Sequence, residues 1–480
     1  MADLINLIGR LRAHREGRAV RAATHRQVTI APHALTIAPL AMAGEDTAIH
    51  AIAIGQIDER PLVRTVPDPR ARDDQYKLVE WLGAKIEDYY ATCRDSGDHP
   101  QIWVSSGAAA GHLDILADRL RFTRDAPRIK RAGELLTYAT ERYPVDGQQA
   151  LITATGALAA HYCTGQQEGE DEHLGAFLTW LDPPTGVDIA RAVEAAERQV
   201  MGVKSDPEFD RNELAPLVSA YNRARKENAP PAEIRRRAAA IEAKLSPIVI
   251  TIYDAVQRAL GYLQGFQPAG VLSELSTREC QEFESFMNAR DRGMALPYRD
   301  NPKAAAFKIS DREAAVQNLQ RGSLYGDEMA QARARLDGTI LNGITSNLSQ
   351  IKVGRKTVQR FTVETTQTNL HLRSADELAL LRDPRLRCVV EDVSRAGAGT
   401  RVSFLVTAGM NCVGAPQDGT VVDLAPPPPE WFRLIKQRQK MAARLSERPW
   451  THGEAGLPAP QAAPTAARPN DLLAAVESLR

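Results

Sequence analysis

Acidic residues are the first candidates for catalysis in this sequence. Several carboxylates that converge on one point can hold two divalent metal ions, which together hydrolyse a phosphodiester bond. Asp114 and Asp118 lie on a helix predicted over residues 107–122, and Glu45 and Asp46 lie in an upstream hairpin loop. The predicted strands on either side of that loop carry no carboxylate. We therefore predict no catalytic residue, and a metal-dependent nuclease that uses these four acids is the alternative.

A second group of possible metal ligands surrounds a polar loop. It consists of His161, Glu170, Asp171, Glu172 and His173. An acidic loop that caps the N-terminus of a short helix, predicted over residues 173–181, explains the same residues through the helix dipole. The five cysteines are scattered and show no C-x-x-C spacing, which argues against a zinc site and a disulfide framework. We predict no metal site, and a reducing cytoplasm as the compartment.

Motifs that bind the phosphates of nucleotides are absent from the sequence. There is no Gly-x-x-x-x-Gly-Lys-[Ser/Thr] loop and no dinucleotide fingerprint. Residues 353–357 end in Gly-Arg-Lys-Thr, but Arg355 separates the glycine from the lysine, and the segment opens a strand instead of following one. We therefore expect no cofactor.

Basic residues near a β-rich stretch are the best candidates for ligand contact. They are Lys352, Arg355, Lys356, Arg360, Arg373 and Arg401. A barrel binds a nucleic-acid strand through a basic groove and stacked aromatic rings, although only 5% of this chain is aromatic. The alternative is a sheet edge that lysine and arginine protect from pairing with other chains. The chain has 60 basic and 60 acidic residues, so any basic surface must be local.

The β-rich stretch spans residues 356–410 and shows the clearest two-residue alternation of apolar and polar residues. Strands are predicted over residues 361–365, 370–373, 388–393 and 402–406, with a hairpin turn over 395–399. Several short strands in so few residues favour a small antiparallel barrel, because closure hides the sheet edges.

Strands and helices alternate in the N-terminal region. Strands are predicted over residues 28–30, 34–37, 50–54, 61–66 and 102–104, and helices over 73–93 and 107–122. This order resembles an RNase H-like 3′–5′ exonuclease domain of the kind attached to RecB-like nucleases and helicases. Carboxylates on the first hairpin and after the middle helix hold two metals in that family. Their absence here implies a degenerate RNase H-like α/β domain that has lost its nuclease chemistry.

The predicted fold class is mixed: an α/β domain, a long helical stalk and a small barrel. We expect a basic N-terminal helix (1–24), the degenerate RNase H-like domain (25–125), a helical subdomain (126–185), a helical stalk (186–336), an OB- or 1B-like antiparallel barrel (337–424), a proline spacer with a basic helix (425–450), and a disordered linker with a terminal helix (451–480). Individual helices are predicted over residues 148–163, 231–245 and 247–261, and one helical arm over 301–336.

The order of these parts resembles the region before the motor in bacterial superfamily 1B helicases of the nonsense-mediated-decay and Okazaki-nuclease type. The phrase from Arg360 to Arg373 is similar to the start of the barrel that those helicases carry on a helical stalk. Residues 471–476 resemble the helix that leads into their nucleotide-binding loop. The resemblance implies a non-catalytic protein that binds single- or double-stranded nucleic acid.

The same resemblance implies a helicase or ATPase partner on a separate chain, in DNA repair or phage defence. DNA and RNA both remain open as ligands. A scaffold that binds only other proteins is the remaining alternative. No run of residues approaches the roughly 18 apolar residues of a membrane span, so we expect no membrane contact.

Overall fold

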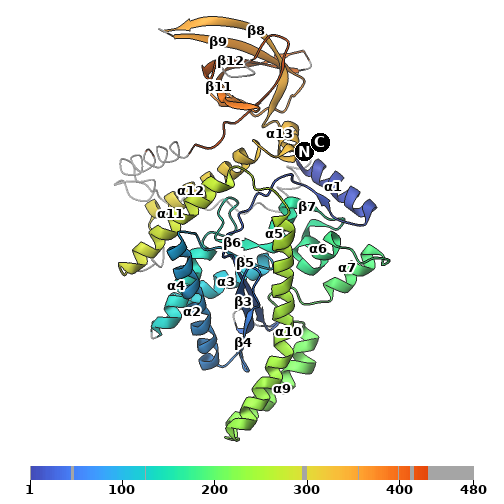
Figure 1. The fold of residues 1–480 in the computed structure, drawn as a ribbon, viewed down its shortest axis with the longest axis vertical. Helices are drawn as coiled ribbons and strands as arrows, with labels where there is room; N and C mark the ends of the chain where they lie inside the picture. Colours follow the sequence, from blue (N-terminus) through green and yellow to red (C-terminus); the bar gives the residue numbers. More distant parts are fainter. Residues whose placement is uncertain are drawn as a thin grey trace, which may run out of the picture. The chain divides into compact units, whose positions relative to one another are not determined.

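The computed structural model describes residues 2–44, 48–124, 126–294, 300–354, 356–397, 399–410, 416–430 and 440. The chain divides into two units. Residues 1–296 and 315–429 form the first, which contains an α/β region and a barrel (Figure 1). Residues 297–314 and 430–480 form the second, of which 300–314 are described. The basic helix predicted after the proline spacer and the linker and helix predicted over 451–480 lie outside the described residues, apart from residues 430 and 440.

A five-stranded mixed sheet forms the centre of the α/β region. Its strands, in the order β4-β3-β2-β5-β6 across the sheet, are β2 (Leu35–Ala41), β3 (Ile49–Gln56), β4 (Leu62–Thr65), β5 (Ile102–Val104) and β6 (Leu151–Thr153). Strands β2, β3 and β4 are antiparallel, whereas β5 runs parallel to β2 and β6 parallel to β5. Every residue of β2 is buried, as expected for an apolar strand with helices on both faces.

The strand predicted over residues 28–30 is not formed. Instead, the backbone N–H of Thr29 donates to Gln149 Oε1 at 2.8 Å, and that of Ala31 donates to Gln101 Oε1 at 3.0 Å. Two buried glutamine side chains therefore supply the acceptors that a neighbouring strand would otherwise provide. The predicted strand over 102–104 is confirmed as β5.

The helix predicted over residues 148–163 is wrong in its first part. Residues 151–153 form β6, and helix α5 (Ala154–His161) begins only after it. The apolar run is too short to distinguish a buried strand from a buried helix by its periodicity. Because β6 completes the sheet, the α/β region continues beyond the expected boundary at residue 125.

One face of the sheet is covered by four helices. They are α2 (Arg72–Ser96), α3 (Gly107–Leu120), α4 (Pro127–Thr140) and α11 (Leu272–Asp291). Their apolar residues form one core with Ile37 and Ile52 of the sheet. Tyr90 is fully buried there, and its hydroxyl donates to the backbone oxygen of Leu135 at 3.0 Å. The helices predicted over 73–93 and 107–122 are confirmed as α2 and α3.

The opposite face is covered mainly by one long helix, α10 (Pro231–Gln264), which packs beside α5, α6 (Leu174–Leu181) and α9 (Ala215–Lys226) (Figure 1). Two helices separated before Pro247 were expected, but α10 continues through this proline. Pro247 costs α10 one backbone hydrogen bond. Apolar packing of Leu245 before the proline and Val249 after it outweighs this loss. Residues 231–264 and 272–291 of the expected stalk therefore cover the sheet.

Three longer helices remain in the α/β region and its connection to the barrel: α1 (Ala2–Glu16), α12 (Pro302–Ser323) and α13 (Glu328–Asp337). The other remaining elements are short: β1 (Val20–Arg21), β7 (Tyr162–Cys163), the 3₁₀ turn η1 (Glu168–Glu172), α7 (Ile189–Glu197), α8 (Pro207–Phe209) and the π-helical turn η2 (Asp210–Leu214). The basic N-terminal helix is confirmed as α1. None of the described helices combines the length and the apolar character needed to cross a membrane.

The helical arm predicted over residues 301–336 is broken into α12 and α13 by Asp327. One carboxylate oxygen of Asp327 caps α13 by accepting from the N–H groups of Met329 and Ala330. The other accepts from the N–H groups of Thr24 and His25, at 3.0 and 3.2 Å. A single buried carboxylate therefore begins a helix and ties it to the N-terminal segment.

The C-terminal strands close into a six-stranded antiparallel barrel in the order β10-β11-β12-β9-β8-β13. They are β8 (Leu341–Val353), β9 (Lys356–Thr365), β10 (Glu377–Leu380), β11 (Asp383–Ala396), β12 (Gly399–Ala408) and β13 (Val421–Ala425). Strand β10 pairs with both β11 and β13, which closes the sheet. Phe361 and Phe404 stack at the centre of its core, with ring centroids 5.3 Å apart.

Three of the four predicted barrel strands are confirmed, as β9, β11 and β12. The strand predicted over residues 370–373 is wrong: its residues form a loop. Strands β8, β10 and β13 were not predicted, because their sequences alternate less clearly. Gly338 joins α13 to the barrel with a φ of 85°, where a side chain would meet the backbone oxygen of Asn369 at 2.2 Å.

Candidate nucleic-acid interface

The structure describes two of the four acids of the nuclease alternative, Asp114 and Asp118. Asp114 and Asp118 lie on the solvent-exposed side of α3, and Asp118 forms an ion pair with Arg121 at 2.6 Å. Glu45 and Asp46 lie outside the described residues. Within the described part of the chain, no group of three or more His, Cys, Asp or Glu side chains could hold a metal ion. Apolar cores cover both faces of the central sheet.

His161 has a structural role. Its ring is fully buried, Nε2 accepts from the backbone N–H of Gln27 at 2.9 Å, and Nδ1 lies 2.6 Å from the backbone oxygen of Ala157. This pairing requires the neutral ring with its proton on Nδ1. Burial lowers the pKa of His161, which also favours the neutral form.

The acidic loop of residues 168–172 is also explained by structural contacts. Glu170 and Gln167 form a reciprocal cap at the start of η1, and not at the start of the helix predicted over residues 173–181. The buried carboxylate of Asp171 forms an ion pair with Arg10 of α1 at 2.8 Å. His173 caps α6 by accepting from the N–H of Ala176. These contacts fix the N-terminal helix to the α/β region.

The structure separates the six predicted basic residues into two kinds. Arg360 and Arg401 lie on the barrel wall and are paired with acids: Arg360 with Glu391 at 2.7 Å, and Arg401 with Glu364 at 2.8 Å. The hydrogen bond with Glu391 raises the pKa of Arg360. Because each guanidinium has a carboxylate partner, neither contributes a full positive charge to the barrel surface.

Of the other four predicted residues, the structure describes the side chains of Lys352 and Arg373. Lys352 is exposed on β8, directly opposite Thr357 of β9. The backbone of Lys356 begins β9, and Arg355 lies outside the described residues. Arg373 is exposed in the loop that replaces the predicted strand over 370–373. Of the four side chains that the structure describes, those of Arg360 and Arg401 are paired on the barrel wall, and those of Lys352 and Arg373 are exposed on β8 and in the loop.

The end of the β8–β9 hairpin extends beyond the rest of the barrel. Pairing of β9 with β12 ends at Arg360, whereas pairing of β8 with β9 continues as far as Val353 and Lys356. Residues 350–353 and 356–359 therefore pair only with each other among the described strands, and we call residues 350–359 the ribbon. In Figure 1, β8 and β9 run past the ends of their neighbours. A bulge between Ser346 and Ser349 bends β8 just before the ribbon begins.

The ribbon is basic and carries no acid. Residues 338–363 contain four basic residues, Lys352, Arg355, Lys356 and Arg360, and no Asp or Glu. The first three lie in the ribbon, with which no third strand pairs among the described residues. This acid-free interval is visible in the sequence itself.

Aromatic side chains do not line the barrel surface. Residues 338–425 contain two aromatic residues, Phe361 and Phe404, and both are fully buried in the barrel core. A platform for base stacking needs exposed rings, so this barrel is better suited to contact phosphates than bases.

Comparison with known proteins gives no assignment, since no family model, curated protein or solved structure matches this chain.

Proposed function

We propose that this protein is a non-catalytic nucleic-acid-binding protein that contacts the phosphate backbone through the basic ribbon and acts beside a helicase or ATPase motor on a separate chain. The acid-free ribbon, on which Lys352 is exposed, is the observation that carries the proposal. Lysine and arginine that neutralise phosphates release condensed counterions, which makes such a surface bind nucleic acid without reading its sequence.

Duplex DNA is the ligand that the ribbon fits best. A two-stranded β-ribbon fits the major groove of B-form DNA. Single-strand binding would instead rely on exposed aromatic rings, which residues 338–425 do not offer.

The arrangement of the sheet supports an RNase H-like origin for the α/β region. Three successive antiparallel strands are followed by a helix and then by two parallel strands, each followed by a helix. The resemblance rests on the first part of this order, the strands followed by a helix, a strand and a second helix, and β6 and α5 extend it. We propose that the region keeps the fold and has lost the chemistry, because β2 carries no carboxylate and is buried.

The role beside a motor rests on the resemblance to superfamily 1B helicases, in which an OB- or 1B-like barrel stands on helices. The six-stranded closed barrel and the helix α13 that leads into it are compatible with that arrangement. DNA repair and phage defence are the settings that the resemblance implies.

The test is the salt dependence of DNA binding by the full chain. We expect the triple variant Lys352→Ala, Arg355→Ala, Lys356→Ala to reduce the slope of log affinity against log salt by about two to three units, as expected if each residue contacts one phosphate. Arg401→Ala is the matched control, because Arg401 is basic and exposed on the same barrel but paired with Glu364. Its slope should change by less than about one unit.

Three outcomes would overturn the proposal. If the triple variant keeps the parent's slope, the ribbon is not the contact surface. If the parent binds neither duplex nor single-stranded DNA or RNA at low salt, a protein-binding scaffold takes the place of the nucleic-acid function. Magnesium- or manganese-dependent nuclease activity that disappears in Asp114→Asn would show that the chain is an enzyme.

A further inference from the structure

Strand β4 is one edge of the five-stranded sheet, and within the described residues it pairs with β3 alone. Its register sets Arg64 opposite Ile52, and the N–H of Val66 donates to the backbone oxygen of His50 at 2.8 Å. In an antiparallel pair, hydrogen-bonded and non-hydrogen-bonded residues alternate. Val63 and Thr65 therefore direct their backbone N–H and C=O groups away from the sheet.

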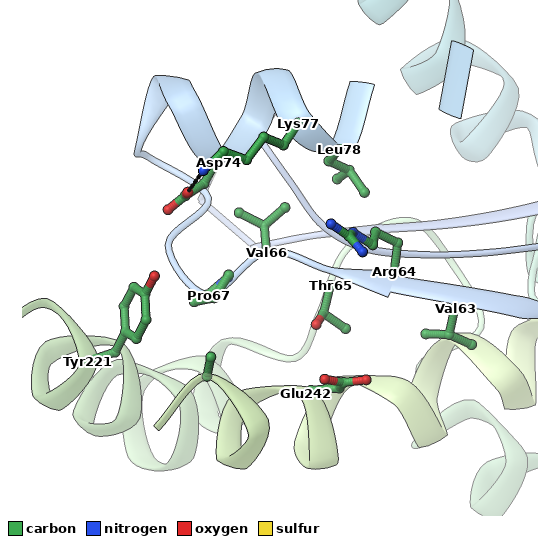
Figure 2. A pocket seen from close by; sticks show the side chains of 11 residues that line it. Val63, Arg64, Thr65, Val66, Pro67, Asp74, Lys77, Leu78, Tyr221 and Glu242 are labelled. Carbon is green, nitrogen blue, oxygen red and sulfur yellow. Dashed lines mark hydrogen bonds and ion pairs between the residues drawn. The ribbon is translucent and has the colours of Figure 1, made fainter. Parts of the chain in front are cut away.

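A groove of about 320 Å³ runs along this edge. Figure 2 shows β4 between α2 and the helices α9 and α10. The side chains of Val63, Arg64, Thr65, Lys77, Tyr221 and Glu242 contribute to its lining. The outward backbone groups of β4 therefore lie in a cleft between helices, where an added strand would be held from both sides.

The two walls of the groove differ in charge. Arg64 of β4 and Lys77 of α2 lie on one side, and Thr65 and Glu242 lie on the other (Figure 2). Asp74 lies near the same end of α2, but its carboxylate is already held by Arg225 at 3.1 Å and by Lys77 at 3.5 Å. Two cations and one carboxylate therefore line the side of α2, which leaves a net positive charge centred on Arg64, and Glu242 makes the side of α10 acidic.

We infer that the β4 edge binds an extended peptide segment of a partner protein, which adds a strand beside Val63 and Thr65 and directs an acidic side chain toward Arg64 and Lys77. Successive side chains of a strand point to opposite faces. An acidic residue on the α2 side thus alternates with an uncharged or basic residue on the side of Glu242. Main-chain hydrogen bonds supply affinity and the two walls supply specificity, as in other cases of strand addition to a sheet edge.

A second copy of this chain fits the edge less well than a peptide does. If two copies of β4 paired antiparallel through both Val63 and Thr65, the symmetry would set Arg64 directly opposite Arg64. Like charges directly opposite each other destabilise a strand pair. Each copy would also have to bring its own flanking helices into the groove.

The test measures binding of a fluorescent five-residue peptide, acetyl-Thr-Glu-Thr-Glu-Thr-amide, to the full chain by anisotropy. Thr65→Pro removes an N–H that points away from β3, and proline is tolerated on an edge strand with that geometry. We expect about tenfold weaker binding in Thr65→Pro, because one hydrogen bond is lost and the ring crowds the added strand. Thr65→Ala keeps the N–H and should bind within about twofold of the parent.

A charge-reversal experiment keeps the proposal testable even where Thr65→Pro does not fold. The parent should prefer the glutamate peptide to its lysine counterpart, acetyl-Thr-Lys-Thr-Lys-Thr-amide, and the double variant Arg64→Glu, Lys77→Glu should prefer the lysine peptide. Equal binding of both peptides by both proteins, or no binding of either by the parent at low salt, would overturn the inference. A dimer of the parent that disappears in Thr65→Pro would assign the edge to a second copy instead.

Discussion

The central sheet and the ribbon are both built from β-strands, but they place polar groups in opposite surroundings. In the sheet region, helices cover both faces, and buried polar groups such as Gln101 and Gln149 are paired inside the protein. In the ribbon, two strands pair only with each other, and Lys352 is exposed. A polar group in the first region acts on stability, whereas one in the second is available to a ligand.

Buried acids of the α/β region and basic residues of the ribbon differ in the same way as candidate ligand-binding residues. Asp171 is buried and forms an ion pair with Arg10, and this pair holds α1 against the α/β region. Lys352 and the other basic residues of the ribbon have no acid within residues 338–363. An enclosed, paired charge indicates a structural role, and a local excess of one sign on an exposed element indicates a partner of the opposite sign.

Substitution in the buried core should produce the largest effect. Trp103 lies on β5, is fully buried, and its indole N–H donates to Gln101 Oε1 at 2.8 Å. Trp103→Ala should lower the free energy of unfolding by about 3–5 kcal/mol, because it leaves a cavity in a packed core. Denaturant unfolding followed by circular dichroism measures this change.

Trp103→Phe, in the same core and beside the same Gln101 acceptor, is the control for loss of the whole side chain. It keeps most of the apolar volume and should cost clearly less than the alanine variant. A loss below about 1 kcal/mol for Trp103→Ala would contradict the packing described for this sheet.

Acidification should produce the next largest effect, through histidines that are buried in neutral form. Burial lowers the pKa of His50 to about 4, against a smaller opposing effect of Asp210. An unfolded chain takes up this proton near pH 6.5, whereas the folded protein takes it up only near pH 4. Stability is therefore complete above about pH 6.5 and is lost as the pH falls toward 4, by about 3 kcal/mol for this residue.

Unfolding measured at several pH values between 4 and 7 tests this prediction. Burial also lowers the pKa of His99 and His161, so their contributions fall in the same direction. His50→Gln should flatten the dependence. A parent whose stability is constant from pH 7 to 4 would contradict the neutral, buried state of these rings.

The smallest effect on stability should come from the ribbon itself. The triple variant Lys352→Ala, Arg355→Ala, Lys356→Ala should change the free energy of unfolding by no more than about 0.5 kcal/mol, since exposed charges away from special sites contribute little. Thermal melting of the variant and parent at equal salt gives the comparison. A large loss of stability would place these side chains among the structural residues and remove the contrast with the buried sheet.

Much of the fold follows from local sequence patterns. The three-and-four spacing of apolar residues identified α2 and α3, and two-residue alternation identified β9, β11 and β12, since each pattern reflects one buried face. These patterns depend only on residues close together in the sequence, so they can be recognised without the tertiary structure.

Tertiary contacts decided the rest. Residues 151–153 became a strand because β5 offers them a parallel partner, and residues 28–30 did not, because buried glutamines satisfy their N–H groups. Pro247 does not end α10, because packing on the sheet holds the helix together.

For the candidate site, the sequence by itself determined which residues are basic and that residues 338–363 contain no acid. Only the tertiary structure decided which of those charges are available. Glu391 and Glu364 lie far along the chain from Arg360 and Arg401 and reach them only because the barrel brings the strands together. The same holds for the β4 edge, whose groove exists because α2, α9 and α10 meet beside one short strand. Composition fixes the charges available to the protein, and long-range packing decides which of them are neutralised and which face a partner.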